Sequence, residues 1–242
     1  MLSKLLTGLT VILVAGVLLS GCGIYVGVRA LRGSGRTSTQ SYDFEDFKRL
    51  EVGNAFVVDV TQGDDFSVSV TVDDNLVQYL DVVQRGDTVR ISLQPGSYTN
   101  TRLEARVTMP LLVSADLSGA TQANLRGLQS EDDLKLVVSG ASQVRGDATA
   151  ASLDLVLSGA SQANLTGKAS SLRVRASGAS KAELADYAVE TADVDLSGAS
   201  SGTVSADNSL DVTLSGASTL HYLGQPKLGR QSISGASQLK KG

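Results

Sequence analysis

The sequence predicts an all-β fold, a single-domain β-solenoid that follows an N-terminal membrane-targeting segment. The tripeptide Ser-Gly-Ala occurs seven times, at intervals of about 19 residues. Apolar and mainly polar residues alternate on both sides of each tripeptide. The composition includes 25 glycines, 3 prolines, no tryptophan and 4% aromatic residues. Such a composition suits many short strands joined by tight corners.

Each repeat contains two short strands that meet at its glycine. In the repeat around Gly159, Leu155 and Leu157 precede the glycine in alternation, and Ala163 and Leu165 resume the alternation after it. This spacing gives each strand one inward face, which a single unit cannot bury but stacked units can. We expect a right-handed parallel β-helix, because crossovers between parallel strands are usually right-handed. The repeat glycines are Gly119, Gly140, Gly159, Gly178, Gly198, Gly216 and Gly235.

Small and hydroxyl-bearing residues define the corner of each repeat. Glycine allows positive φ or a close backbone approach, and the alanine that follows it is small enough for the inside of a bend. Ser or Thr comes next, and we expect these hydroxyls to form an outward row that could bind a repetitive ligand. The alternative is that they only satisfy backbone groups at the corner. The candidate recognition face comprises Thr121, Ser142, Ser161, Ser180, Ser200, Ser218 and Ser237.

The N-terminus predicts export and lipid attachment. Lys4 precedes an apolar stretch, and Leu19-Ser20-Gly21-Cys22 places small residues before the only cysteine. This pattern resembles the lipobox of bacterial lipoproteins, which implies cleavage before Cys22 and acyl chains such as palmitate on its thiol. The alternative is an uncleaved membrane helix, because residues 5–28 are long and apolar enough to span a bilayer.

This interpretation divides the chain into three parts. Residues 1–21 are the signal peptide, residues 22–42 are the lipidated N-terminus with a flexible Gly/Ser-rich linker, and residues 43–242 are the solenoid. Within the solenoid, residues 56–60, 66–72 and 88–93 are β-branched runs separated by turn sequences, and we expect them to cap the first coils.

The C-terminal repeat is predicted to be an end coil that faces solvent. Gly229 and Gln231 replace apolar residues in the inward register, and Lys240 and Lys241 close the chain. The alternative is that the exposed coil mediates contact between copies, so oligomerisation through the solenoid ends stays open.

The sequence offers little material for catalysis or metal binding. His221 is the only histidine, and Cys22 is assigned to the anchor, so we expect neither a zinc site nor a cofactor site, and no catalytic residues. Asp154, Asp195 and Asp211 could align outward across coils, where like charges repel unless a cation binds them. The calcium-binding repeat of β-rolls is missing, however, so we assign no metal ligand.

The residues just described also form an ordered set of longer motifs. These are Phe47, Leu50-Glu51-Val52, Val60-Thr61-Gln62-Gly63-Asp64, residues 70–76, Met109-Pro110, the Ser-Gly-Ala-Ser repeats, Tyr222-Leu223-Gly224-Gln225-Pro226 and Ser234-Gly235-Ala236-Ser237. Their order resembles the bacterial family called putative auto-transporter adhesin, head GIN domain. The resemblance covers nearly all of the mature chain. It implies a β-helical envelope domain with an adhesin role, and it supplies no catalytic motif.

These observations predict a non-enzymatic cell-envelope lipoprotein that acts as an adhesin-like or surface-binding module. In a Gram-negative host it would be lipid-anchored at the outer membrane or face the periplasm. Its expected partners are the membrane and an envelope or surface ligand, either polysaccharide or protein. A net charge of -4 without a long basic run gives no indication of nucleic-acid binding. The alternatives are an envelope scaffold or stress-related lipoprotein without adhesion, and a β-helical carbohydrate-active enzyme.

Overall fold

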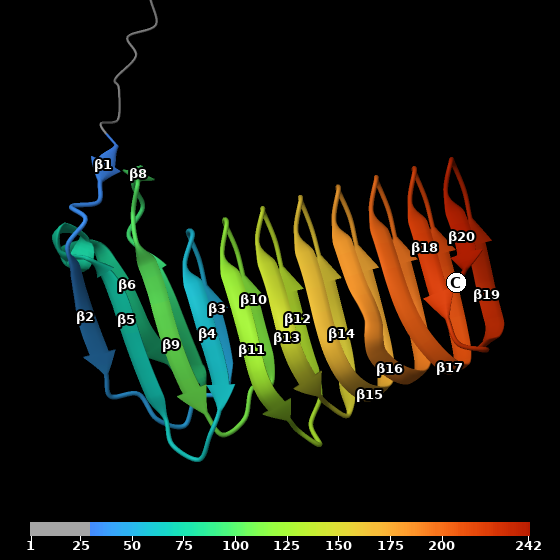
Figure 1. Cartoon of the computed structure of the whole chain (residues 1–242), viewed down its shortest axis with the longest axis horizontal. Helices are drawn as coiled ribbons and strands as arrows, with labels where there is room; N and C mark the ends of the chain where they lie inside the picture. Colours follow the sequence, from blue (N-terminus) through green and yellow to red (C-terminus); the bar gives the residue numbers. More distant parts are fainter. Residues whose placement is uncertain (1–29) are drawn as a thin grey trace, which may run out of the picture.

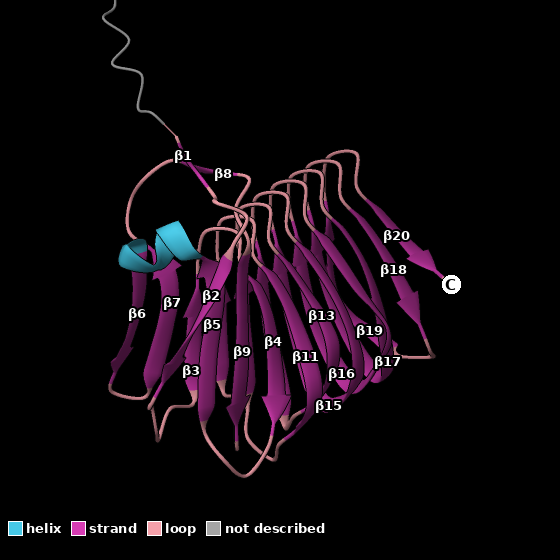
Figure 2. Ribbon diagram, turned by 60° about the vertical axis from the view of Figure 1, so that its left-hand side comes forward, coloured by secondary structure: helices cyan, strands magenta, loops and turns pink. Residues whose placement is uncertain are grey.

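The computed structural model describes residues 30–242, which form one elongated β-solenoid (Figure 1). Two sheets of mainly parallel strands face each other across the core, and the chain passes from one to the other in every coil (Figure 2). This architecture confirms the predicted all-β solenoid. The predicted signal peptide and Cys22 lie outside the described residues. Within residues 30–242, no helix is long and apolar enough to cross a membrane.

We call the sheet that precedes the glycine corners sheet 1 and the sheet that follows them sheet 2. Sheet 1 contains β6 (Leu80–Arg85), β7 (Thr88–Leu93), β3 (Arg49–Val52), β10 (Ser114–Leu117), β12 (Leu134–Val138), β14 (Ser152–Leu157) and β19 (Lys227–Ile233). Sheet 2 contains β2 (Thr37–Tyr42), β5 (Ser67–Asp73), β9 (Leu103–Met109), β4 (Val57–Gln62), β11 (Gln122–Gln129), β13 (Gln143–Thr149), β18 (Thr219–Leu223) and β20 (Gln238–Lys241). Both sheets share β15 (Gln162–Ala176), β16 (Lys181–Leu196) and β17 (Ser201–Leu214). A separate parallel pair joins β1 (Leu31–Arg32) to β8 (Tyr98–Thr99).

Successive coils stack in register, so each inward side chain lies on its equivalent in the next coil. In sheet 1, Ala115 pairs with Leu136, Leu136 with Leu155, and Leu155 with Val174. All four side chains are buried. The inward rows therefore form one continuous hydrophobic core, as expected of a repeat protein whose units bury their apolar faces against their neighbours.

The corner at each repeat glycine is built from backbone contacts between coils. The seven glycines have φ values of 70–79°. The N–H of Ala160 donates to the carbonyl oxygen of Gly140 at 2.7 Å, and the other corners repeat this bond. A Cβ atom on Gly159 would lie 2.6 Å from the same oxygen, so only glycine satisfies both the dihedral angle and the contact. The alanines are exposed, and the prediction that they occupy the inside of the bend is wrong.

An eighth corner, which lacks the tripeptide, begins the solenoid at Asn54. Its φ is 61°, and its carbonyl oxygen accepts the N–H of Ala120 at 2.6 Å. Its side-chain Oδ1 accepts the N–H of Leu93 at 2.8 Å. Asparagine can occupy this corner because it tolerates the left-handed region better than most non-glycine residues.

The N-terminal end of the solenoid is closed by antiparallel strands, which include the predicted capping strands β5 and β7. β5 is antiparallel to β9 and to β2, β6 is antiparallel to β7, and the short 3₁₀ helix η1 (Asp74–Tyr79) follows β5. The rings of Phe47 and Phe66 lie 5.0 Å apart at this end, and Phe47 is fully buried. Aromatic packing therefore seals the first coils from water.

The prediction of a flexible linker over residues 22–42 is wrong for residues 37–42. Residues 37–42 form β2, which pairs with β5 along its full length. Ser38, Gln40 and Tyr42 are half-buried while the residues between them are exposed. A polar segment can form this strand because the edge of β5 supplies its backbone hydrogen-bond partners.

We predict that Gly159→Ala destabilises the protein by roughly 3 kcal/mol, because it combines positive φ with the clash against the Gly140 oxygen. Gly86→Ala is the matched control, since Gly86 also has positive φ but open space around its Cβ position. Its cost should be about 1 kcal/mol. Chemical denaturation of both variants measures the difference, and equal costs would contradict the role of the inter-coil contact.

Candidate binding surface

The Ser/Thr row lies inside the solenoid, so the prediction that it forms an outward recognition face is wrong. Six of the seven residues are at most 1% exposed, and Ser237 in the last coil is half-buried. The hydroxyl of Ser180 donates to the Ser177 carbonyl oxygen at 2.8 Å, three residues earlier. Thr121, Ser200 and Ser218 form the same bond within their own corners. The alternative of corner chemistry is confirmed, because these hydroxyls satisfy backbone groups where each coil turns.

The residue after each hydroxyl faces outward and forms the surface of sheet 2. Gln122, Gln143 and Gln162 are exposed and paired in register across three successive coils. Two residues further on, Asn124, Arg145 and Asn164 form a second outward row in the same register. We call these six side chains the amide face. The positions give one hydrogen-bonding side chain per coil in each row, at the strand spacing of about 4.8 Å.

Hydrogen bonds hold part of the amide face in a fixed arrangement. Arg145 Nε donates to Asn124 Oδ1 at 2.6 Å, and Asn124 Nδ2 donates to Asp59 Oδ1 at 2.8 Å. Arg126 Nη2 lies 3.1 Å from the same carboxylate oxygen. A shallow cleft of about 500 Å³ opens here, between Asn124 and Asn164. The two Nη atoms of Arg145 and the side-chain amides of the three glutamines make no hydrogen bond or ion pair with other described residues, which leaves them free to bind a ligand.

The outer face of sheet 1 has a different chemistry, with acids and bases interleaved. The predicted outward acids Asp154, Asp195 and Asp211 do lie on this face. Arginines from neighbouring coils pair with Asp154 and Asp211, and also with Asp193, which lowers the repulsion between these carboxylates. The ion pairs are Arg175 Nη2–Asp154 Oδ1 (2.9 Å), Arg173 Nε–Asp193 Oδ2 (3.7 Å), Arg230 Nη2–Asp193 Oδ1 (3.3 Å) and Arg230 Nη2–Asp211 Oδ2 (3.9 Å). These pairs are exposed and add little stability each.

A second cleft, of about 530 Å³, lies over the first coils of sheet 1 and contains three acids. Partial burial and the adjacent Glu51 carboxylate raise the pKa of Asp116, while Lys135 opposes the shift. Arg90 lies 3.6 Å from Glu51 and 3.5 Å from Asp81. This arrangement is an ion-pair network around one arginine, and it does not pair a free nucleophile with a base.

The other polar and aromatic candidates do not form a site. His221 is exposed on sheet 2, and residues 30–242 contain no group of three or more His, Cys, Asp or Glu residues that could hold a metal ion. Tyr187 is fully buried, and burial raises its pKa to about 12. It therefore cannot serve as an aromatic platform for a sugar, and the half-buried Tyr222 offers little more.

The glutamine row could have been found from the sequence. The hydroxyl residue is followed by glutamine in four of the seven repeats, at Gln122, Gln143, Gln162 and Gln238. Alternate residues of a strand point to the same side, and Ser161 lies two residues before the inward Ala163 and four before Leu165. The alternation therefore places the hydroxyl inside and the glutamine that follows it outside.

The fold and its flat polar face define a repeat-built β-solenoid that presents an extended surface. The chain belongs to the family described as "Putative auto-transporter adhesin, head GIN domain", which matches residues 46–226. This match confirms the family resemblance seen in the sequence.

Solved structures share the fold. A putative adhesin from Bacteroides fragilis NCTC 9343 is 20% identical with a TM-score of 0.81, and the alignment covers 88% of this chain and 100% of that one. A putative lipid binding protein from Parabacteroides distasonis ATCC 8503 is 17% identical with a TM-score of 0.73, covering 88% and 99%. A putative adhesin from the same organism is 18% identical with a TM-score of 0.70, again covering 88% and 99%. No curated protein matches the sequence of this chain.

Proposed function

We propose that this protein is a non-enzymatic, lipid-anchored adhesin-like module that binds a repetitive, hydroxyl-rich polymer, such as a surface polysaccharide, along the amide face. The observation that carries the proposal is the registered array of Gln122, Gln143 and Gln162 beside Asn124 and Asn164. Each amide offers two donors and an acceptor with two lone pairs, which suits sugar hydroxyl groups. The family and the neighbouring structures named as adhesins support the same class of activity.

The geometry favours a linear polymer that lies along the solenoid axis. Such a polymer meets one side chain from each row in each of the three coils that form the amide face, at intervals of about 4.8 Å. Hydrogen bonds exposed to water contribute modestly, about 1 kcal/mol each. Binding should therefore be weak for a short oligomer and strengthen with chain length, because further contacts form without a new loss of translational freedom.

Attachment to the cell envelope supports this activity. The lipobox-like sequence ending at Cys22 would hold the N-terminus at a membrane, and the adhesin description of the family is consistent with a surface or envelope location. The first strand of the solenoid, β2, starts at Thr37, about 15 residues after that cysteine. The amide face, which lies on β11, β13 and β15, would then be held away from the membrane by the strands of the first coils.

We expect the triple variant Gln122→Ala, Gln143→Ala and Gln162→Ala to lose at least about tenfold in affinity for a ligand selected on an array of envelope glycans. Its stability should change little, because all three side chains are exposed. Glycan-array binding and surface plasmon resonance measure the affinity, and thermal unfolding monitors the fold.

The matched control removes three outward side chains from sheet 1 instead, at Lys135, Arg173 and Thr213. This control should bind like the wild-type protein. Equal losses in both triple variants would contradict recognition by the amide face. A failure of the wild-type protein to bind any glycan or intact cells would favour the scaffold alternative.

The anchor has its own test. Cys22→Ser should prevent acylation, so metabolic labelling with a palmitate analogue should mark the wild-type protein and leave the variant unlabelled. Labelling of the variant, or no labelling of either protein, would contradict a lipid on Cys22 and favour an uncleaved helix.

A further inference from the structure

The two ends of the solenoid both expose sheet edges. Among the described residues, β20 pairs only with β18 and β19 only with β17 at the C-terminal end. At the N-terminal end, β2 pairs only with β5 and β6 only with β7. Each end therefore presents one unpaired edge from sheet 1 and one from sheet 2, which can accept a strand from another molecule.

The C-terminal coil is also incompletely covered. Ile233 is 45% exposed, although it pairs with the buried Leu214 and continues the same inward row. Leu228 and Leu239 are only partly buried. The apolar interior of the solenoid thus reaches solvent at this end, in contrast with the aromatic seal at the other.

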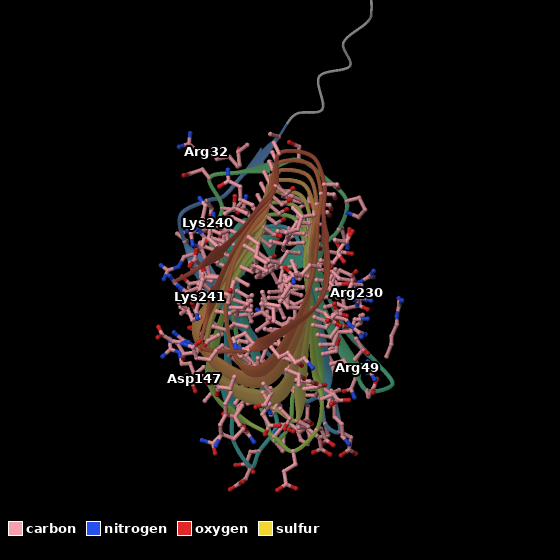
Figure 3. All side chains as sticks on the ribbon, turned by 90° about the vertical axis from the view of Figure 1, so that its right-hand side faces the viewer. Arg32, Arg49, Asp147, Arg230, Lys240 and Lys241 are labelled. Atoms are coloured by element: carbon pink, nitrogen blue, oxygen red, sulfur yellow. The ribbon has the colours of Figure 1, made fainter. Side chains whose placement is uncertain are left out.

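The charges of the two ends are opposite. Residues 212–242 contain four Lys and Arg residues and no Asp or Glu. Viewed from this end, Lys240 and Lys241 lie on one side of the open coil and Arg230 on the other (Figure 3). Residues 37–87, which form the other end, contain eleven Asp and Glu residues against three Lys and Arg.

The register of sheet 2 aligns these opposite charges. Successive pairings connect Ser41 of β2 to Lys240 of β20 through one row that crosses every coil. A second molecule placed in the same register would set its Ser41 beside Lys240. Tyr42, the last residue of β2, would then lie beside Lys241. The exposed Asp43 follows Tyr42 directly and the exposed Glu45 lies two residues further on, so two carboxylates would lie just past the end of the paired strand, near the two lysines.

We propose that this protein associates head to tail with a second copy of itself, the cationic edge of β20 pairing in parallel with β2 of the next molecule. The pairing extends sheet 2 across the junction and covers Ile233 and Leu239. Complementary charge selects this arrangement over the tail-to-tail dimer, in which two edges of four cations each would meet. Lysines on an edge strand protect it against pairing with an identical edge, and the same lysines attract an acidic one. The proposal goes beyond ligand binding and does not depend on it.

The test is sedimentation velocity of the full chain in mild detergent, at about 10 mM and about 1 M salt, where the Debye length falls from roughly 30 Å to 3 Å. The wild-type protein should associate as its concentration rises at low salt and dissociate at high salt. Lys240→Glu with Lys241→Glu should weaken association at least about tenfold, and so should Asp43→Lys with Glu45→Lys. Circular dichroism should show that both variants keep the wild-type fold.

The variant that carries all four substitutions distinguishes a head-to-tail contact from a tail-to-tail contact. Reversal of both ends restores opposite charges in a head-to-tail contact, so self-association should return to the wild-type level. In a tail-to-tail dimer that pairs β20 with β20, positions 240 and 241 would carry the same negative charge in both copies, and association would stay weak. A wild-type protein that remains monomeric at low salt, or association that no charge variant alters, would overturn the proposal.

Discussion

The structure depends on one contact, in which the backbone of each glycine corner touches the corner of the coil before it. The amide of each corner alanine donates to the carbonyl oxygen of the preceding corner, at 2.6 Å to Asn54 and at 2.7–2.8 Å to the glycines, and a Cβ atom at the repeat glycine would collide with that oxygen. A positive φ directs the chain from sheet 1 into sheet 2 at the same point. Since the coils can approach to strand-pairing distance only at such a corner, the register of both sheets follows from this contact.

The regular register then determines whether each row of side chains lies in the core or on the surface, and which side chains it places next to one another. Inward positions stack into a core of small and medium aliphatic residues, and the buried hydroxyls complete the hydrogen bonding of the corner. Outward positions stack into surface rows whose chemistry differs between the sheets. Sheet 1 carries paired charges such as Arg175 and Asp154, which satisfy one another. Sheet 2 carries the amide face, where Gln122, Gln143 and Gln162 remain unpaired within the described part of the chain. Unpaired hydrogen-bonding groups in a regular array can bind successive units of a repetitive polymer.

The sequence predicted the repeat, the inward residues and the capping strands. Apolar residues alternate with polar ones within each repeat of about 19 residues, and this alternation indicates which side chains are buried. Besides the exposed corner alanines, three features were not predicted, each for a physical reason. The hydroxyl row was placed outside because serine is usually exposed, although Ser161 has the parity of the buried Ala163. Asn54 was not recognised as a corner because the corners were identified by their glycines, and asparagine can also adopt the left-handed conformation. β2 was assigned to a linker because its stability comes from the edge of β5, which local sequence does not reveal.

Amide hydrogen exchange followed by NMR tests the central contact most directly. Ala141, Ala160, Ala179, Ala199 and Ala217 lie on the exposed ridge of corners, yet their amides donate to glycine carbonyl oxygens of the preceding coil. The amides of the neighbouring glycines have no hydrogen-bond acceptor among residues 30–242. The account predicts that the alanine amides exchange as slowly as those of the core strands, while the adjacent glycine amides exchange rapidly. Rapid exchange at both residues would show that the corners do not hold the coils together, and it would contradict the account.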